Sequence, residues 1–195
     1  MEAELKKALA QRKKIYITDN SRVPAAVLIP IYKDNGEYNI VFIKRTMTIK
    51  SHQGQISFPG GMRDDGDKSL WDTALRESDE EIGLRSADVN KIGEMDDEIT
   101  TTSNYIVTPF VAMIPWPYRL VPNQGEVEYI LTVPLKTLLD KECRKPEKEM
   151  LDGEEIESFA YYYQGTRIWG ATARILYKLL GIIAELPVTK PRRNP

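Results

Sequence analysis

The sequence has 195 residues but only one cysteine, Cys143, and one histidine, His52. A single cysteine cannot form an intramolecular disulfide or a thiolate metal cluster, and a single histidine excludes a zinc site of the HExxH type. The sequence also lacks the GxGxxG and GxxxxGK[ST] phosphate-binding motifs. A thiolate metal cluster, an HExxH-type zinc site and these two phosphate-binding motifs are therefore excluded.

Long hydrophobic runs and a large net charge are missing as well. The longest apolar runs, 25–31 and 179–186, are much shorter than the roughly 20 residues needed to cross a bilayer. With 27 basic and 29 acidic residues, the net charge of −2 gives no reason to expect nucleic acid or a membrane as a partner. The amino terminus predicts an amphipathic helix and not a signal peptide. We therefore expect a cytoplasmic protein, and a homodimer is compatible with the sequence.

Hydrophobic periodicity predicts an α/β (α+β) fold in which a mixed β-sheet is sandwiched between α-helices. We expect one domain over residues 1–186, including a helical extension over 1–19, followed by a disordered tail over 187–195. The predicted strands are 25–32, 38–45, 88–95, 106–114, 127–133, 159–163 and 166–168. The predicted helices after the extension are 69–82, 135–139 and 172–185.

The predicted helix at 69–82 carries three glutamates, Glu77, Glu80 and Glu81. At about 100° per residue they share one side of the helix, and an apolar stripe lies on the opposite side. We therefore expect all three carboxylates to point away from the core. Ligands that are all oxygen favour Mg²⁺ or Mn²⁺, ions that typically bridge to phosphate oxygens. The alternative is an ordinary solvated acidic face.

Residues 61–84 resemble the Nudix box, Gly-x5-Glu-x7-Arg-Glu-U-x-Glu-Glu-x-Gly-U, where U is apolar. The segment RESDEEIGL at 76–84 fits the second half, with Ser78 at the first U position. The first half departs from the pattern, because the gap between Gly61 and Arg76 is one residue longer than usual. Lys68 then stands where the first glutamate is expected. The resemblance identifies the chain as a member of the family that hydrolyses nucleoside diphosphates linked to another group.

The preceding segment is similar to a second signature, found in the Nudix branch that cleaves coenzyme A. Its matching residues are Phe42-Ile43-Lys44-Arg45-Thr46, Lys50 in place of an arginine, Gly54, and Phe58-Pro59-Gly60-Gly61. An ammonium such as that of Lys50 cannot hold a phosphate bidentately as a guanidinium does. The likeness to this branch extends over about residues 20–186.

The resemblance implies a Mg²⁺ or Mn²⁺ site built from Glu77, Glu80 and Glu81, with the carbonyl of Gly61 as a further ligand. Arg76 would be the structural partner of these acids. The implied catalytic residues are the three box glutamates and Glu126. The general base would be a box glutamate or an acid from the loops, and Glu126 is our choice among the loop acids. Candidates to bind substrate phosphates are Arg45, Lys50 and Arg63.

The implied substrate is a small nucleotide diphosphate, coenzyme A or an acyl derivative. Its hydrolysis would give 4′-phosphopantetheine, or its acyl form, and adenosine 3′,5′-bisphosphate. A second hypothesis keeps the chemistry but changes the substrate to a nucleoside triphosphate, a dinucleotide or ADP-ribose. A third hypothesis is a Nudix module that binds a nucleotide without cleaving it.

Overall fold

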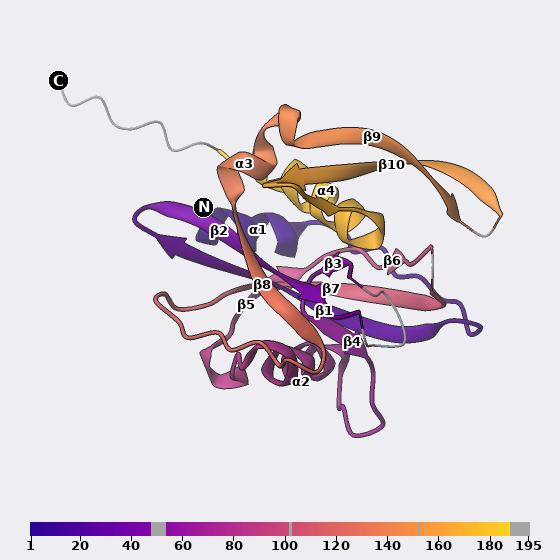
Figure 1. Ribbon diagram of the computed structural model, residues 1–195, viewed down its shortest axis with the longest axis horizontal. Helices are drawn as coiled ribbons and strands as arrows, with labels where there is room; N and C mark the ends of the chain where they lie inside the picture. The colour runs from indigo at the N-terminus through magenta and orange to yellow at the C-terminus, as the bar shows by residue number, and fades with distance from the viewer. Residues whose placement is uncertain (48–53, 102, 152, 188–195) are drawn as a thin grey trace.

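A central mixed β-sheet lies between helices in the computed structural model, which describes residues 1–47, 54–101, 103–151 and 153–187 (Figure 1). The helices are α1 (Glu2–Gln11), α2 (Leu70–Ile82), η1 (Ser86–Asp88), α3 (Leu135–Leu139), η2 (Lys141–Cys143) and α4 (Gly170–Ala184). The first sheet contains β1 (Val23–Asp34), β2 (Glu37–Arg45), β3 (Ile56–Ser57), β4 (Gly60–Met62), β5 (Asn90–Glu94), β6 (Glu98–Ile99), β7 (Tyr105–Met113) and β8 (Val127–Pro134). A second, antiparallel sheet contains β9 (Arg144–Leu151), β10 (Glu154–Tyr163) and β11 (Thr166–Ile168).

The first sheet is mixed, as the sequence predicts. Strand β1 runs parallel to β7, from the pair Val23↔Tyr105 to the pair Ile31↔Met113. The same strand runs antiparallel to β2 and to β4. The turn between β1 and β2 has Asn35 at φ 46° and Gly36 at φ 89°, the two positive φ values that a tight hairpin turn of this twist requires.

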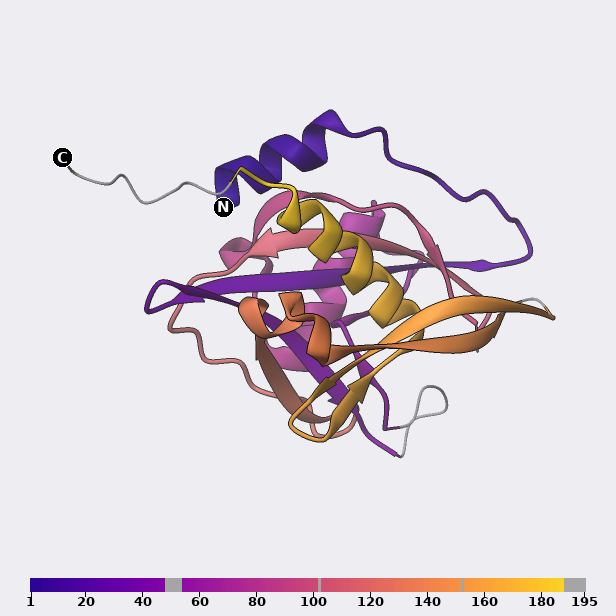
Figure 2. The same cartoon turned by 90° about the horizontal axis from the view of Figure 1, so that it is seen from above.

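Both faces of this sheet are covered, which explains the continuous apolar runs of its central strands. Helix α2 packs on one face, where Ala74 and Ile82 join a buried cluster with Leu28. Helices α1 and α4 pack on the other face, as Figure 2 shows, in a cluster that includes Leu5 and Leu179. Within the described residues, no helix combines the length and apolarity needed to cross a membrane.

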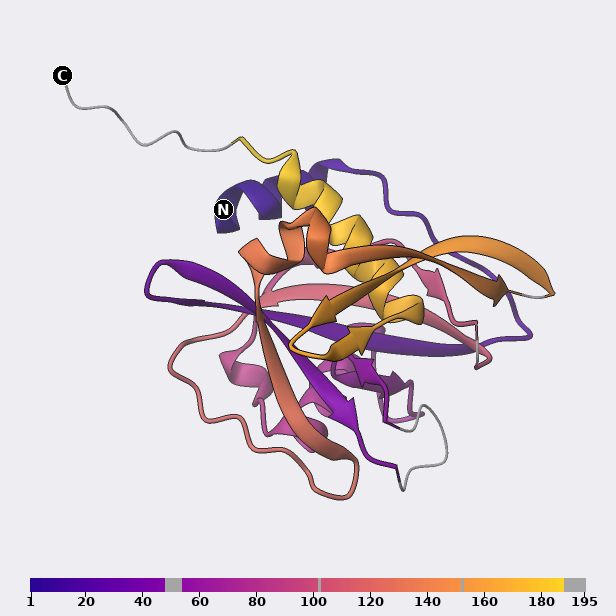
Figure 3. The same cartoon turned by 45° about the horizontal axis from the view of Figure 1, so that its top comes forward.

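Strands β1 and β2 separate from each other after a short paired stretch. They pair only from Ile31↔Ile40 to the turn. Beyond that point β4 pairs with the first half of β1, and β3 pairs with β2 at Ile43 and Lys44. Strand β8 pairs with β2 along most of its length, from Asn39 to Arg45. Figure 3 shows the two strands diverging from their shared turn. The opening between them holds the candidate site described below.

The structure differs from the sequence prediction mainly at β9 and the first half of β10, which the sequence did not predict. Residues 188–195, which hold most of the predicted tail, lie outside the described part of the chain, as do Lys50 and His52.

Candidate active site

Helix α2 is positioned by its two caps and by a buried serine. The Ser69 side chain accepts a hydrogen bond from the backbone N–H of Asp72, and Gly83 ends the helix at φ 66°. Ser78, which replaces an apolar residue of the Nudix box, is fully buried. Its Oγ donates to the Ala74 carbonyl at 2.7 Å, so the hydroxyl is satisfied within the helix. The serine therefore faces the core as the apolar residue would.

Glu81 is buried, so the expectation that all three glutamates point away from the core is wrong for this residue. Only 1% of Glu81 is exposed. Arg45 Nη1 donates to Glu81 Oε1 at 2.8 Å, and the Gly60 N–H donates to Oε2 at 2.9 Å. Burial raises the pKa of Glu81 to about 8, although both donors act in the opposite direction. Two partners distant in sequence thus hold this carboxylate between α2 and the sheet.

Arg76 links the acidic face of α2 to the preceding loop. Its Nη1 donates to Glu77 at 2.9 Å and to Glu80 at 3.0 Å. On its other side, Nε and Nη2 each donate to a different oxygen of Asp67 at 3.1 Å. This fork-to-fork arrangement fixes the guanidinium, and through it the two glutamates.

Asp67 supplies the carboxylate that the sequence appeared to lack. It is 8% exposed, and hydrogen bonding from Arg76 is the largest cause that lowers its pKa, to about 2. Lys68, assigned from the sequence to this position, is exposed, so that assignment is wrong. Passing over the five intervening residues of the box from Gly61 leads to Asp67, whereas passing back over its seven intervening residues from Arg76 leads to Lys68. The additional residue therefore lies between Asp67 and Arg76.

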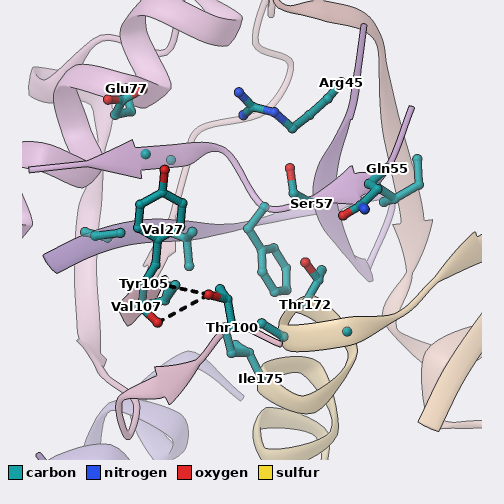
Figure 4. A pocket seen from close by; sticks show the side chains of 18 of the residues that line it. Val27, Arg45, Gln55, Ser57, Glu77, Thr100, Tyr105, Val107, Thr172 and Ile175 are labelled. Atoms are coloured by element: carbon teal, nitrogen blue, oxygen red, sulfur yellow. Dashed lines mark hydrogen bonds between the residues drawn. The ribbon is translucent and has the colours of Figure 1, made fainter. Parts of the chain in front are cut away.

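A cavity of about 370 Å³ extends from α2 to the first turn of α4. It brings together five of the residues singled out from the sequence: Arg45, Gly61, Glu77, Glu80 and Glu126. Figure 4 shows Glu77 and Arg45 at the same end of this cavity. Burial raises the pKa of Glu77, and repulsion from Glu80 and Glu126 raises it further. Acidic side chains from α2 and from the segment before β8 therefore act on one another here.

The two glycines of β4 allow close packing around this cavity. A Cβ at Gly61 would lie 2.5 Å from the carboxyl carbon of Glu77, so this carboxylate rests directly against the Gly61 backbone. Gly60 has φ 151°, and a Cβ there would lie 2.3 Å from the backbone oxygen of Ala26. Side chains at these positions would separate β4 from α2 and from β1.

Two donors in the cavity wall are left without partners. Arg45 Nε and Ser57 Oγ are buried and have no hydrogen-bond partner among the described residues. Both residues line the cavity, and both are labelled in Figure 4. A buried donor without a partner costs about 1–3 kcal/mol. Both atoms are closed off from solvent in the structure, so a side-chain movement would have to expose them before a ligand oxygen could accept from them.

The donors around the acidic face also fit a hard cation. Glu77, Glu80 and Glu126 offer only oxygen atoms, the chemistry that Mg²⁺ and Mn²⁺ prefer. In the described part of the chain, however, no three acidic, histidine or cysteine side chains form a ready-made cation site. Instead, Arg76 contacts Glu77 and Glu80, and Arg45 contacts Glu81.

Of the other two predicted phosphate-binding residues, Arg63 does not line this cavity and Lys50 lies outside the described residues. Arg63 is exposed, and its Nη2 donates to the Asp67 carbonyl at 3.1 Å. It lines a second hollow, of about 310 Å³, which also reaches Arg76 and Glu77. Sequence reasoning missed Asp67 and Ser57. Forward counting from Gly61 would have found Asp67, whereas no sequence signal distinguishes Ser57 from other serines.

Comparison with known proteins agrees with this fold. The family model of the NUDIX domain matches residues 22–153, well over half of the chain, so the chain belongs to the Nudix family. It is accordingly a Nudix hydrolase, a pyrophosphohydrolase. Members of this family generally depend on a divalent metal.

Curated relatives and solved structures support the assignment. The Nudix hydrolase NudL of Photorhabdus laumondii is 36% identical over 163 residues, which cover 84% of this chain and 86% of the relative. The chloroplastic Nudix hydrolase 22 of Arabidopsis thaliana is 33% identical over 179 residues, 88% of this chain but only 59% of that longer protein. The crystal structure of RenU, a Nudix hydrolase from M. smegmatis, has a TM-score of 0.56 at 18% identity and covers 87% of this chain and 91% of RenU. That structure shows the shared fold.

Proposed function

We propose that this Nudix hydrolase cleaves the diphosphate of coenzyme A, or of an acyl derivative, into 4′-phosphopantetheine, or its acyl form, and adenosine 3′,5′-bisphosphate. One observation carries the proposal. Residues of the coenzyme A signature, Arg45, Phe58, Gly60 and Gly61, line the same cavity as Glu77 and Glu80 of the Nudix box. The two motifs meet at Gly61 in the sequence, and residues from both line one cavity.

In this proposal Glu77, Glu80, Glu81 and the Gly61 carbonyl hold Mg²⁺ or Mn²⁺. When bound, the divalent cation supplies positive charge to the diphosphate oxygens as negative charge develops on them. Arg76 keeps Glu77 and Glu80 in orientation by its hydrogen bonds to both. Arg45 Nη1 lies 2.8 Å from Glu81 Oε1 in the structure. To bind the cation, Glu81 would therefore have to give up this ion pair or share its carboxylate between Arg45 and the metal.

Proton transfer is assigned to the carboxylates of the cavity. Water attacks one phosphorus, the bridging P–O bond breaks, and the departing phosphate takes the electron pair. Glu126 or a box glutamate accepts the proton from the attacking water. Without a bound cation, burial raises the pKa of Glu77, and repulsion from Glu80 and Glu126 acts in the same direction. Arg45 lines the cavity beside these acids, so its guanidinium adds positive charge near the diphosphate.

A second substrate class is favoured by one departure from the coenzyme A signature. Lys50 replaces an arginine, so the grip on a phosphate that this position offers is weaker. A nucleoside triphosphate, a dinucleotide or ADP-ribose would need no 3′-phosphate contact there. The chemistry at Glu77 and Glu80 would be unchanged.

A substrate panel tests the proposal. Purified protein with Mg²⁺ or Mn²⁺ should hydrolyse coenzyme A with a higher kcat/KM than dephospho-coenzyme A, ADP-ribose, NADH or nucleoside triphosphates. Glu77→Gln should lower kcat by about 100-fold or more. Asp79→Asn, an acid-to-amide change on the exposed face of the same helix, should leave it unchanged. Equal rates with coenzyme A and ADP-ribose would favour the second substrate class.

A further inference from the structure

The cavity of the candidate active site differs in chemistry between its two ends. Its charged lining residues, Arg45, Glu77, Glu80 and Glu126, come from α2, the end of β2 and the residue before β8. The other end is closed by the first turn of α4, as Figure 4 shows. Among the described residues, none that lines this second end carries a formal charge. We call it the uncharged end and define it by Thr100, Tyr105, Val107, Thr172 and Ile175.

The walls of the uncharged end are mostly apolar or already hydrogen-bonded. Val107 and Ile175 contribute aliphatic surface. The hydroxyl of Thr100 donates to the carbonyl of Ser103 and accepts from the backbone N–H of Tyr105 at 3.0 Å. A ligand group therefore gains more here from burying apolar surface than from side-chain hydrogen bonds.

The first turn of α4 adds backbone donors to this end. Gly170, Ala171 and Thr172 line the cavity. The preceding residue, Trp169, provides no side-chain cap. The first N–H groups of a helix have no partner within the helix, so they can donate to carbonyl oxygens of a ligand. Apolar walls combined with neutral donors suit an uncharged chain that contains amide groups.

A phosphate monoester fits this end less well. Its two negative charges would lie between apolar walls without a side-chain cation from the described lining residues. By contrast, the second hollow contains Arg63 and Arg76, together with Asp64, Asp65 and Glu77. Glu77 lines both hollows, so a diphosphate bound beside it can extend into each of them.

We propose that the uncharged end binds the pantetheine arm of the substrate, its neutral and amide-containing half. The adenosine half, with its 3′-phosphate, then extends toward Arg63. This inference rests on the proposed coenzyme A function and adds the direction in which the substrate lies.

Separate binding of the two reaction products tests this direction. Titration calorimetry in the presence of Mg²⁺ measures the Kd of 4′-phosphopantetheine and of adenosine 3′,5′-bisphosphate. Thr172→Trp fills the uncharged end, so it should raise the Kd of 4′-phosphopantetheine by about tenfold or more. The Kd of adenosine 3′,5′-bisphosphate should change by less than about twofold. Ala171→Leu, a smaller change in the same turn, should act in the same direction if the tryptophan variant does not fold. Arg63→Ala should raise the Kd of adenosine 3′,5′-bisphosphate and leave the Kd of 4′-phosphopantetheine unchanged.

The control for added bulk on α4 is Ala184→Trp, at the exposed far end of that helix, which should change neither Kd. Loss of adenosine 3′,5′-bisphosphate binding in Thr172→Trp, equal loss of both products, or no binding of either product to the unaltered protein would each overturn the inference. Turnover of coenzyme A by the unaltered protein decides the proposed function separately. If the protein cleaves coenzyme A but Thr172→Trp weakens binding of adenosine 3′,5′-bisphosphate and not of 4′-phosphopantetheine, the proposed function stands and the proposed orientation of the substrate is wrong.

Discussion

The substitution Asp67→Asn tests whether Asp67 is the acid that holds Arg76. The amide keeps the shape of the side chain but removes its charge and one acceptor. In the folded protein, Asp67 accepts two hydrogen bonds from Arg76, one from Thr73 Oγ1 at 2.8 Å and one from the Asp64 N–H at 2.9 Å. Asp67 is 8% exposed, so solvent screens these interactions only partly.

The pKa of Asp67 gives the size of the expected loss of folding free energy. Its value is lowered from 3.8 to about 2, chiefly by Arg76, and each pKa unit corresponds to about 1.4 kcal/mol. The ionised form therefore stabilises the folded protein by roughly 2 kcal/mol at neutral pH. Because the folded-state pKa lies below the ordinary value, this stabilisation is present above about pH 4 and disappears as the pH falls toward 2.

Urea unfolding at pH 7 measures the effect. Asp67→Asn should lower the free energy of unfolding by roughly 2 kcal/mol, or the Tm by about 4–8 °C for a protein of this size. Activity should also fall, since Arg76 would lose the partner that orients it toward Glu77. Asp65→Asn, in an exposed position of the same loop, is the matched control and should change stability by less than about 0.5 kcal/mol. Equal stability of the two variants at pH 7 would refute the role assigned to Asp67.

Three further predictions concern the residues around α2. Gly61→Ala should abolish most activity with little change in Tm, because the new methyl group displaces the flexible Glu77 side chain from 2.5 Å away. Gly60→Ala should instead lower Tm strongly in a thermal melt, because its methyl group would meet the Ala26 backbone at 2.3 Å. With chelator present, stability should fall as the pH rises from about 4.5 to 8, because burial raises the folded-state pKa of Glu81 to about 8. Urea titrations of Glu81→Gln across that range should lack this fall.

The sequence predicted those parts of the fold that depend on local patterns. Helix α2, predicted over 69–82, begins after the capping residue Ser69 and ends at Gly83, both of which are local signals. The β1–β2 hairpin follows from two apolar runs on either side of the turn residues Asn35-Gly36. Each of these elements is determined by residues that are close together in the chain.

Strand β9 escaped prediction because its sequence, RKPEKEML, contains charged residues on both faces and a proline. Its structure comes from pairing with β10, from Arg144↔Tyr161 to Leu151↔Glu154. Inward-facing charges of this strand are matched by distant partners: Glu149 accepts from Arg174 of α4 and from Ser158 of β10. The spacing of apolar residues along β9 does not indicate that distant residues will pair with its charged side chains.

Glu81 shows the same limit at the candidate site. A helical wheel places Glu77 and Glu81 on one side of α2, but it does not say what packs against that side. The cation and the amide that allow Glu81 to be buried come from Arg45 and Gly60, which belong to two different strands. Prediction from the sequence therefore identified the acidic residues but not the different environments in which they lie.

These different environments have a chemical consequence for the proposed reaction. Glu77 is raised in pKa by burial and by repulsion from Glu80 and Glu126, so the acids at this end of the cavity oppose one another's ionisation. A diphosphate brings further negative charge to the same place. The positive side chains that contact these acids, Arg45 and Arg76, are already engaged with carboxylates. Bringing the diphosphate next to Glu77 therefore requires additional positive charge, which explains in physical terms why this arrangement of side chains suits a metal-dependent hydrolase.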